Sequence, residues 1–168
     1  MNISFSLAAA EDAPAIAALC NDVSAELVRQ FGKGHWGQAV SDRGVLMGIS
    51  NTSKILTARL NGEIVGSLRL ATKKPWAIDI KYFTPVACAL YLTGMTVKPG
   101  LQHHGIGRQL IAEALKICGA WPAGAIRLDA YDADAGAGEF YRKCGFNETG
   151  KVIYKSVPLI YFERVLAE

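Results

Sequence analysis

The sequence lacks most of the features that mark secreted, membrane-spanning or nucleic-acid-binding proteins. Its four cysteines are far apart and include no C-x-x-C pair, which argues against a structural zinc site and a disulfide framework. No run of five basic residues occurs and the formal net charge is only +3, so no nucleic-acid partner is expected. No apolar stretch approaches the ~18 residues of a membrane span, so no membrane partner is expected either. Residues 1–7 lack the pattern of a signal peptide, and we expect a cytoplasmic protein with reduced thiols.

What the sequence does contain is typical of one folded domain. The chain has 168 residues, of which 51% are hydrophobic and 20% charged, which is enough for a substantial core. No internal repeat or low-complexity linker divides it. We therefore predict a single domain over residues 1–168.

Hydrophobic periodicity and turn signals predict a mixed α+β fold. Apolar residues recur at helical spacing over 16–31, and two strand-like runs over 54–60 and 63–71 are joined by Asn61-Gly62, a strong hairpin signal. The other predicted elements are a strand over 3–7, a weaker helix over 39–48, a loop over 72–85, a strand ending near 97, a helix from 106, a strand over 125–130, a helix over 135–143, and two strands over 146–156 and 159–166 that pair around Pro158. This order is that of an α+β domain.

The most informative stretch is a strand followed by a glycine turn and a helix. An apolar, β-favouring run over 90–97 is stopped by Pro99-Gly100, and the pair Gly105 and Gly107 precedes apolar residues at helical spacing. Such a turn aims backbone N–H groups at one point in front of the positive end of the helix dipole, which favours an anion. A plain strand-to-helix turn whose glycines serve only for packing is the alternative.

Residues 102–107, which read Gln-His-His-Gly-Ile-Gly, fit the signature Gln/Arg-x-x-Gly-x-Gly/Ala, and in this the chain resembles the GNAT N-acetyltransferase superfamily. Residues 95–99 upstream and the Phe-Tyr-x-x-Cys-Gly-Phe sequence over 140–146 strengthen the resemblance, which covers essentially the whole chain. The two common nucleotide-binding glycine motifs are absent. The resemblance implies a GNAT-like fold: a central mixed, mostly antiparallel twisted sheet, flanked by helices and splayed at the central strand.

The resemblance also implies a reaction and a donor site. The reaction is acetyl transfer from acetyl-CoA to a primary amine by direct attack in a ternary complex. Backbone groups of Met95 and Val97 would pair with the pantetheine amides. The pyrophosphate would bind to the glycine loop, whose implied cofactor-binding residues are Gln102, His103, His104, Gly105, Ile106, Gly107 and Arg108. Gly94 either marks a bulge where the central strand leaves 125–130 or packs closely.

Tyr141 lies where family members carry the tyrosine that hydrogen-bonds the sulfur of coenzyme A as general acid. A phenol with a pKa of ~10 stays protonated at neutral pH and can donate. A tyrosine that merely packs is the alternative.

Asp134 stands where many members carry an asparagine. Its carboxylate could accept a hydrogen bond from the cofactor, although helix capping explains an aspartate there more simply.

No motif identifies the general base or the acceptor amine. Candidate bases are Tyr91 and Asp79, followed by His35 and Asp132. Cys144 could instead form a covalent acyl-thioester, although an inert thiol is the simpler interpretation. Adjacent histidines rarely reach one ion, so no metal site is expected at 103–104.

Two other functions are compatible with the sequence. One is a non-catalytic sensor that binds coenzyme A or acyl-CoA, and the other is a nucleotide-binding domain, which the missing phosphate-loop lysine disfavours. The loops over 76–83 and 32–37 are expected to line the acceptor pocket, because loops on a rigid scaffold usually carry specificity. The last two strands could present an edge for a homodimer.

Overall fold

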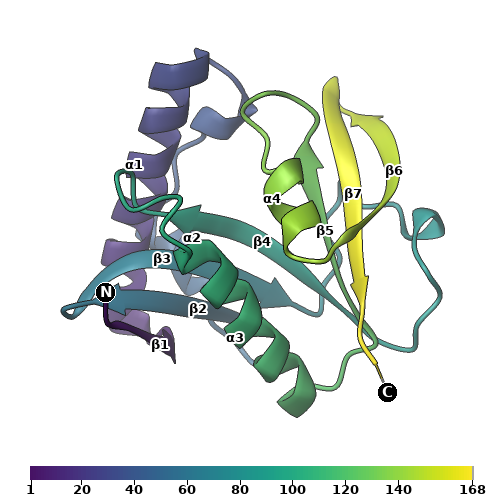
Figure 1. Cartoon of the computed structure of the whole chain (residues 1–168), viewed down its shortest axis with the longest axis horizontal. Helices are drawn as coiled ribbons and strands as arrows, with labels where there is room; N and C mark the ends of the chain where they lie inside the picture. Colours follow the sequence, from purple (N-terminus) through teal and green to yellow (C-terminus); the bar gives the residue numbers. More distant parts are fainter. Residues whose placement is uncertain (168) are drawn as a thin grey trace.

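The computed structural model describes residues 1–167 and is built around one twisted seven-stranded sheet with strand order β1-β2-β3-β4-β5-β7-β6 (Figure 1). The strands are β1 (Ile3–Leu7), β2 (Ser53–Leu60), β3 (Glu63–Ala71), β4 (Ala89–Val97), β5 (Ala125–Tyr131), β6 (Asn147–Tyr154) and β7 (Val157–Val165). The helices are α1 (Ala13–Phe31), α2 (Asp42–Leu46), α3 (Ile106–Ala120) and α4 (Gly138–Lys143), with 3-10 turns η1 (Ala10–Asp12), η2 (His35–Gly37) and η3 (Ile80–Tyr82).

The sheet is mostly antiparallel and opens at its centre. Only β4 and β5 run parallel, and they pair only through Ala89–Tyr91 and Ala125–Arg127. Beyond these residues the two strands diverge, as Figure 1 shows. The predicted mixed sheet that splays at the central strand is therefore confirmed.

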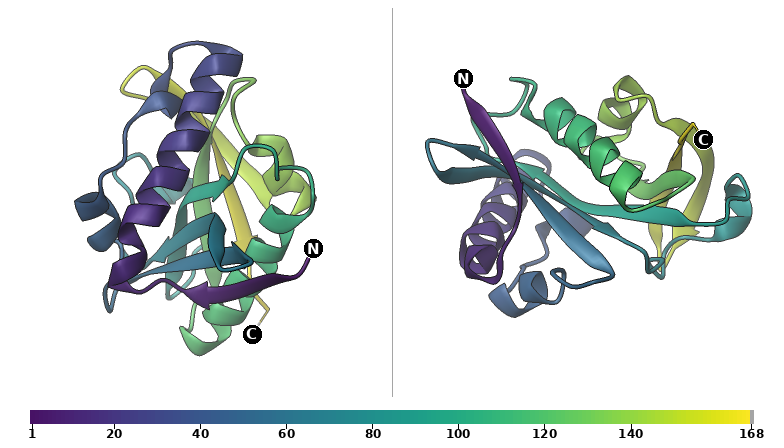
Figure 2. Two further views of the ribbon diagram at one scale, coloured as in Figure 1. Left: turned by 90° about the vertical axis from the view of Figure 1, so that its left-hand side faces the viewer. Right: turned by 90° about the horizontal axis from the view of Figure 1, so that it is seen from below.

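Helices cover both faces of the sheet (Figure 2). Helix α1 buries Ile16, Leu19 and Val23 against β2 and β3, in a core shared with α2. On the other face, α3 buries a stripe at helical spacing that includes Leu110 and Ala114, in the larger core shared with β4, β5 and α4. Both helices are amphipathic, since the apolar stripe packs against the sheet and the polar stripe faces solvent.

Turn geometry explains where the prediction holds and where it fails. Asn61 and Gly62 both have positive φ, as the predicted β2–β3 hairpin requires. The last hairpin turns at Lys155 and Ser156, which also have positive φ, and not around Pro158, which lies within β7 opposite Ile153. The prediction there was wrong because it gave proline more weight than a two-residue turn that fits the twist of the strands.

Two helices are shorter than predicted. Helix α2 starts after Ser41, whose hydroxyl accepts a hydrogen bond from the Gly44 N–H at 3.1 Å. Helix α4 begins at Gly138 and not at Ala135, because a turn closed by the Gly136 N–H and the Ala133 carbonyl comes first. Its N-cap is Ala137, so the interpretation of Asp134 as a helix cap was wrong. No helix within residues 1–167 is long and apolar enough to cross a membrane.

Candidate active site

A cavity of about 410 Å³ lies where β4 and β5 separate. Its walls come from α1, from η2 and the residues after it, from the diverging halves of β4 and β5, and from the segment leading into α4. Its lining residues include His35, Trp36, Gly94, Asp129, Tyr131 and Tyr141. We call this space the central cavity.

Gly94 creates the opening on the β4 side. The register of β3 against β4 shifts between Ser67–Thr96 and Arg69–Thr93, so β4 has one extra residue here. Gly94 has φ +60°, and a Cβ added to it would meet no atom within 4 Å. The bulge is therefore confirmed, and the alternative of a closely packed glycine is wrong. Because a bulge interrupts pairing and bends a strand, it turns the end of β4 away from β5.

The loop between β4 and α3 presents free backbone donors. Gly105 is the N-cap of α3 with φ +84°, and no side chain caps the helix. The first helical bond is donated by the Gln109 N–H to the Gly105 carbonyl, so the N–H groups of residues 106–108 precede the bonded part of the helix. They point out of the helix start, where its dipole is positive. This geometry favours an anion, and the anion site itself stays a prediction.

The polar side chains of this loop bind the loop itself. The Gln102 amide donates to the Val97 carbonyl at 3.2 Å, and the His104 ring contacts the Gln102 carbonyl through Nδ1 at 2.7 Å. Gln102 thus ties the loop to the end of β4. This hydrogen bond uses one lone pair of the Val97 carbonyl oxygen and leaves the other lone pair free to accept.

The second glycine of the loop has a packing role. A Cβ at Gly107 would lie 3.1 Å from the Phe140 ring and 3.2 Å from the Met95 methyl group. The absent side chain lets α3 approach β4 and α4 together. Ile106, beside it, is buried in the main core. Packing therefore constrains this loop at Gly107 and Ile106, whereas the backbone donors lie at the start of α3.

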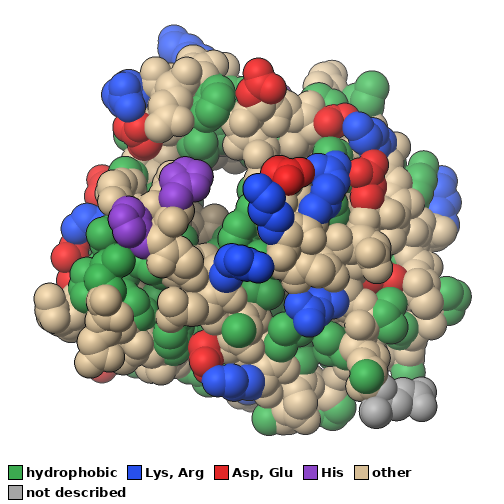
Figure 3. All heavy atoms as spheres, in the orientation of Figure 1, with side chains coloured by type: hydrophobic (Ala, Val, Ile, Leu, Met, Phe, Trp, Pro, Cys, Tyr) green, Lys and Arg blue, Asp and Glu red, His purple; other side chains and the backbone are tan. Residues whose placement is uncertain are grey.

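Basic side chains face this loop across a hollow. Figure 3 shows histidines over the β4–α3 loop on one side and lysines and arginines over α4 and the start of α3 on the other. Arg108 is exposed.

Burial raises the pKa of the Cys144 thiol, although Arg108 and Arg164 oppose the shift. A raised pKa disfavours the thiolate, so Cys144 is poorly suited to covalent catalysis.

Tyr141 lies on α4 and lines the central cavity, although its ring is only 5% exposed. The ring packs among Phe140, Phe146 and Phe162, with centroids 5.3–6.0 Å away. Burial first, and then the charge of Asp129, raise the pKa of Tyr141. The phenol therefore stays protonated and can only donate a proton or a hydrogen bond.

Asp129 on β5 is a cavity residue that the candidate bases from the sequence did not include. Burial raises the pKa of its carboxyl group, and its charge in turn raises the pKa of Tyr131 and Tyr141. A signal for it existed in the strand pattern. Arg127, Asp129 and Tyr131 alternate with the buried residues Ile126, Leu128 and Ala130, which places the polar set on one face of β5.

Of the four candidate bases, only His35 lines the central cavity. Tyr91 is buried in a separate cluster with Phe83 and Tyr161. Asp132 is exposed and paired with Lys151 at 3.2 Å. Among residues 1–167, no group of three or more His, Cys, Asp or Glu side chains is placed to hold a metal ion.

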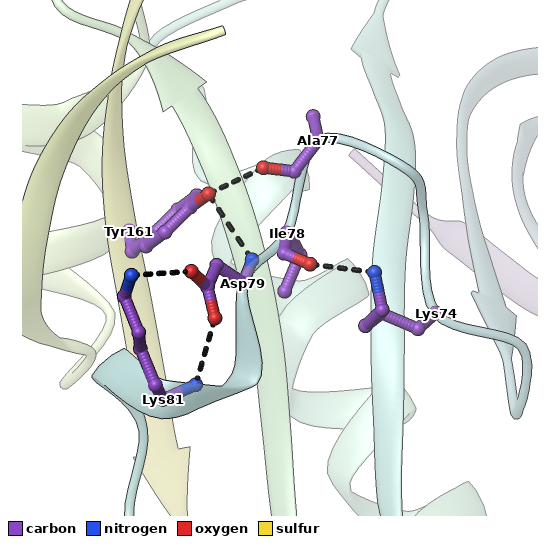
Figure 4. Close-up of polar contacts among 6 residues, drawn as sticks. All are labelled: Lys74, Ala77, Ile78, Asp79, Lys81 and Tyr161. Carbon is purple, nitrogen blue, oxygen red and sulfur yellow. Dashed lines mark hydrogen bonds and ion pairs between the residues drawn. The ribbon is translucent and has the colours of Figure 1, made fainter.

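Asp79, the remaining candidate, belongs to a cluster that holds the loop before β4 (Figure 4). Its carboxylate accepts from the Lys81 N–H at 3.1 Å and pairs with Lys81 Nζ at 3.0 Å. The Tyr161 hydroxyl accepts from the Asp79 N–H at 3.2 Å and donates to the Ala77 carbonyl. Lys74 closes the loop by donating to the Ile78 carbonyl at 2.6 Å.

This loop borders a second cavity of about 390 Å³ that shares no lining residue with the central one. Trp76, Tyr82, Val152 and Tyr161 are among its lining residues. The loop over 32–37 thus borders the central cavity as expected, while the loop over 76–83 lines a different space. Asp134 is exposed and lines neither cavity, and its role toward a cofactor stays a prediction.

A family model described as the acetyltransferase (GNAT) family matches residues 20–146. The structure resembles the PaiA N-acetyltransferase from Thermoplasma acidophilum in complex with coenzyme A, with 18% identity, TM-score 0.77, and coverage of 99% of this chain and 100% of the other. It also resembles the ribosomal-protein-S18-alanine N-acetyltransferase from Escherichia coli, with 15% identity, TM-score 0.73, and coverage of 99% and 96%. An aminoglycoside 6'-acetyltransferase type Ii matches with 16% identity, TM-score 0.70 and 96% coverage of both chains. At such identities these likenesses establish a shared fold.

Proposed function

Because the chain belongs to the acetyltransferase (GNAT) family, we propose that it transfers the acetyl group of acetyl-CoA to a primary amine by direct attack in a ternary complex. One observation carries the proposal beyond family membership. A carboxylate, Asp129, and a phenol, Tyr141, line the same cavity, and the opening of the sheet at β4 forms that cavity. A base and an acid that share one cavity are what amine acylation needs.

The donor side fits coenzyme A in three respects. The N–H groups of residues 106–108 suit a pyrophosphate, because several backbone donors then meet two charged groups. Beyond Tyr91, the edge of β4 that faces β5 is unpaired, so the backbone of Met95 can bond an amide-containing arm as an added strand would. Gly94 leaves open space beside that edge. Acetyl-CoA bound there supplies the acetyl thioester.

Asp129 is proposed to take the first proton. An alkyl amine with a pKa near ~10.4 is an ammonium ion at neutral pH and cannot attack until it loses a proton. A carboxylate whose pKa burial has raised is a stronger base than an exposed one, and is still ionised when the pH lies above that value. It can therefore accept the proton and pass it to water through the cavity.

Tyr141 is proposed to stabilise the leaving sulfur. Its hydroxyl holds a proton because its pKa is raised above the ordinary ~10, so it can donate a hydrogen bond as negative charge develops. The amine nitrogen gains a bond to the carbonyl carbon while the carbon–sulfur bond breaks. The sulfur ends as a thiol, the nitrogen gives up its second proton, and the net reaction releases one proton to solvent.

A pH profile of Asp129→Asn tests these assignments. We expect wild-type protein to release free thiol from acetyl-CoA only when an amine is present. Its kcat/KM should fall with acid through the raised pKa of Asp129, because protonation removes the base. Asp129→Asn should lose about 10²–10⁴-fold in kcat/KM and also lose the acidic limb.

The fold of the variant is checked by thermal unfolding. The folded-state pKa of Asp129 lies above the unfolded value, so ionisation of this carboxyl costs stability at neutral pH. A neutral asparagine avoids that cost, and the variant should be at least as stable as wild type. Binding of acetyl-CoA without turnover of any amine would instead make the chain a sensor. An unchanged acidic limb in Asp129→Asn would refute the role of this residue.

A further inference from the structure

The side of the central cavity away from the glycine loop has an aromatic wall that is held in place. The Trp36 indole N–H donates to the Gly32 carbonyl at 3.1 Å. A Cβ at Gly34 would lie 2.3 Å from the same indole, so the ring lies directly on the glycine. Its other neighbour is Tyr131, edge-to-face at 5.9 Å. These three contacts fix the ring beside the cavity before any ligand binds.

Few ionisable side chains line the cavity. Its lining holds one carboxylate, Asp129, and the imidazole of His35, but no lysine or arginine. None of the ion pairs within residues 1–167 involves Asp129. Asp129 and Tyr131 lie two residues apart on β5 and therefore on the same face. A single cation in the cavity would therefore be close to the carboxylate of Asp129 and to the rings of Trp36 and Tyr131.

The rest of the wall carries no second carboxylate. Val23 and Leu27 of α1 and Val40 after η2 line the cavity, together with the neutral side chains of Ser24 and Gln38. A second positive charge on the same ligand would lose its water without gaining a charged partner, which is costly. The cavity therefore discriminates between amines by the charge and polarity of the part that follows the nitrogen.

Building on the proposed acetyl transfer, we propose that the acceptor is a primary monoamine with an apolar body. Its ammonium group lies against Asp129 and the rings of Trp36 and Tyr131, where cation–π attraction adds to the charge pair. Its body lies on Val23, Leu27 and Val40. A small free amine and a peptide whose first residue is apolar share this chemistry.

An isosteric pair of amines tests the proposal. 1-Aminopentane and 1,4-diaminobutane have the same number of heavy atoms, but the second ends in an ammonium group where the first ends in a methyl group. We expect kcat/KM to favour 1-aminopentane by at least about tenfold, because the cavity offers no second carboxylate for the second charge. Comparing kcat/KM for 2-phenylethylamine with kcat/KM for a tripeptide amide that begins with phenylalanine then distinguishes a small free amine from a peptide as the acceptor.

Three variants at two tryptophans locate the site. Trp36→Leu should lower kcat/KM for 1-aminopentane about 2- to 30-fold through KM, and Trp36→Phe should restore most of the loss. Trp76→Leu is the matched control, because this indole is 84% exposed and borders the second cavity. It should leave the kinetics unchanged, and all three variants should bind coenzyme A as wild type does.

The results separate this inference from the function on which it rests. If no amine is acetylated although acetyl-CoA binds, the proposed function fails and the inference fails with it. If amines are acetylated but 1,4-diaminobutane is preferred, only the inference on the acceptor fails. It fails equally if Trp76→Leu impairs the reaction and Trp36→Leu does not, since the amine would then bind through the second cavity.

Discussion

Replacing Tyr141 with phenylalanine removes one oxygen atom from a buried ring and leaves the packing of the ring in place. The contacts of the ring with Phe140, Phe146 and Phe162 involve only its carbon atoms. No hydrogen bond contributes to the raised pKa of this phenol, so the substitution breaks no bond of the folded protein. We expect the free energy of unfolding to change by well under ~1 kcal/mol.

The cost should appear in turnover instead. A hydrogen bond to a charged acceptor contributes about 1.5–3 kcal/mol. If the Tyr141 hydroxyl gives such a bond to the leaving sulfur only as the carbon–sulfur bond breaks, its removal should lower kcat by about 10- to 150-fold. The affinity for acetyl-CoA should change little, because the bond strengthens only in the transition state. The assays are steady-state release of free thiol, calorimetric titration with coenzyme A, and unfolding in urea.

Tyr161→Phe is a control with the opposite expectation. Its hydroxyl donates to the Ala77 carbonyl and accepts from the Asp79 N–H, and the residue is 1% exposed. Loss of this oxygen leaves backbone groups unpaired, which should cost about 1–3 kcal/mol of stability, with kcat largely retained. If Tyr141→Phe keeps full kcat, the tyrosine only packs and the reasoning fails. If Tyr141→Phe unfolds as readily as Tyr161→Phe, the Tyr141 hydroxyl has a structural hydrogen-bond partner, and its loss cannot be assigned to turnover alone.

Two further predictions concern the loop and the core. Gly105→Ala should cost about 1–2 kcal/mol of stability, measured by unfolding in urea. The cost is conformational, because φ is +84° and the nearest atom to the new Cβ is 3.9 Å away. The affinity for coenzyme A, measured by calorimetry, should also fall, and an unchanged affinity would exclude the loop from the donor site. Glu163→Leu should cost about 3–5 kcal/mol by leaving Arg127 buried without its ion-pair partner at 3.1 Å. Adding Arg127→Met should restore much of that stability, and a double variant as unstable as the single one would contradict this account.

The elements that the sequence predicted well are those whose signals are local. The Asn61-Gly62 hairpin and the amphipathic helices α1 and α3 each depend on residues close together in the chain. The errors came where two local signals competed. At the last hairpin the proline at 158 was given more weight than the turn pair Lys155-Ser156, and before α4 the turn around Gly136 delayed the helix by three residues.

The same distinction explains why a donor side of the candidate site could be proposed from the sequence, whereas the acceptor side could not. The donor side comes from one continuous stretch, the end of β4, the glycine loop and the start of α3, and much of its chemistry belongs to the backbone. A sequence pattern over fewer than twenty residues can therefore describe it. The proposed acceptor side combines Trp36 and Asp129, which lie far apart in the chain and line one cavity where β5 diverges from β4.

Each of these residues also has an ordinary local interpretation. Asp129 is one polar residue in an alternating strand, and Trp36 is one aromatic residue in a loop rich in glycine. In the proposed site their chemistry arises from the cavity that they share: burial raises the pKa of the carboxyl group of Asp129, and the paired rings of Trp36 and Tyr131 would attract a cation. Neither effect is encoded at the position itself. With the proposed acceptor site, single substitutions on α1 or η2 should change acceptor specificity while the donor stretch, and with it the family signature, stays the same.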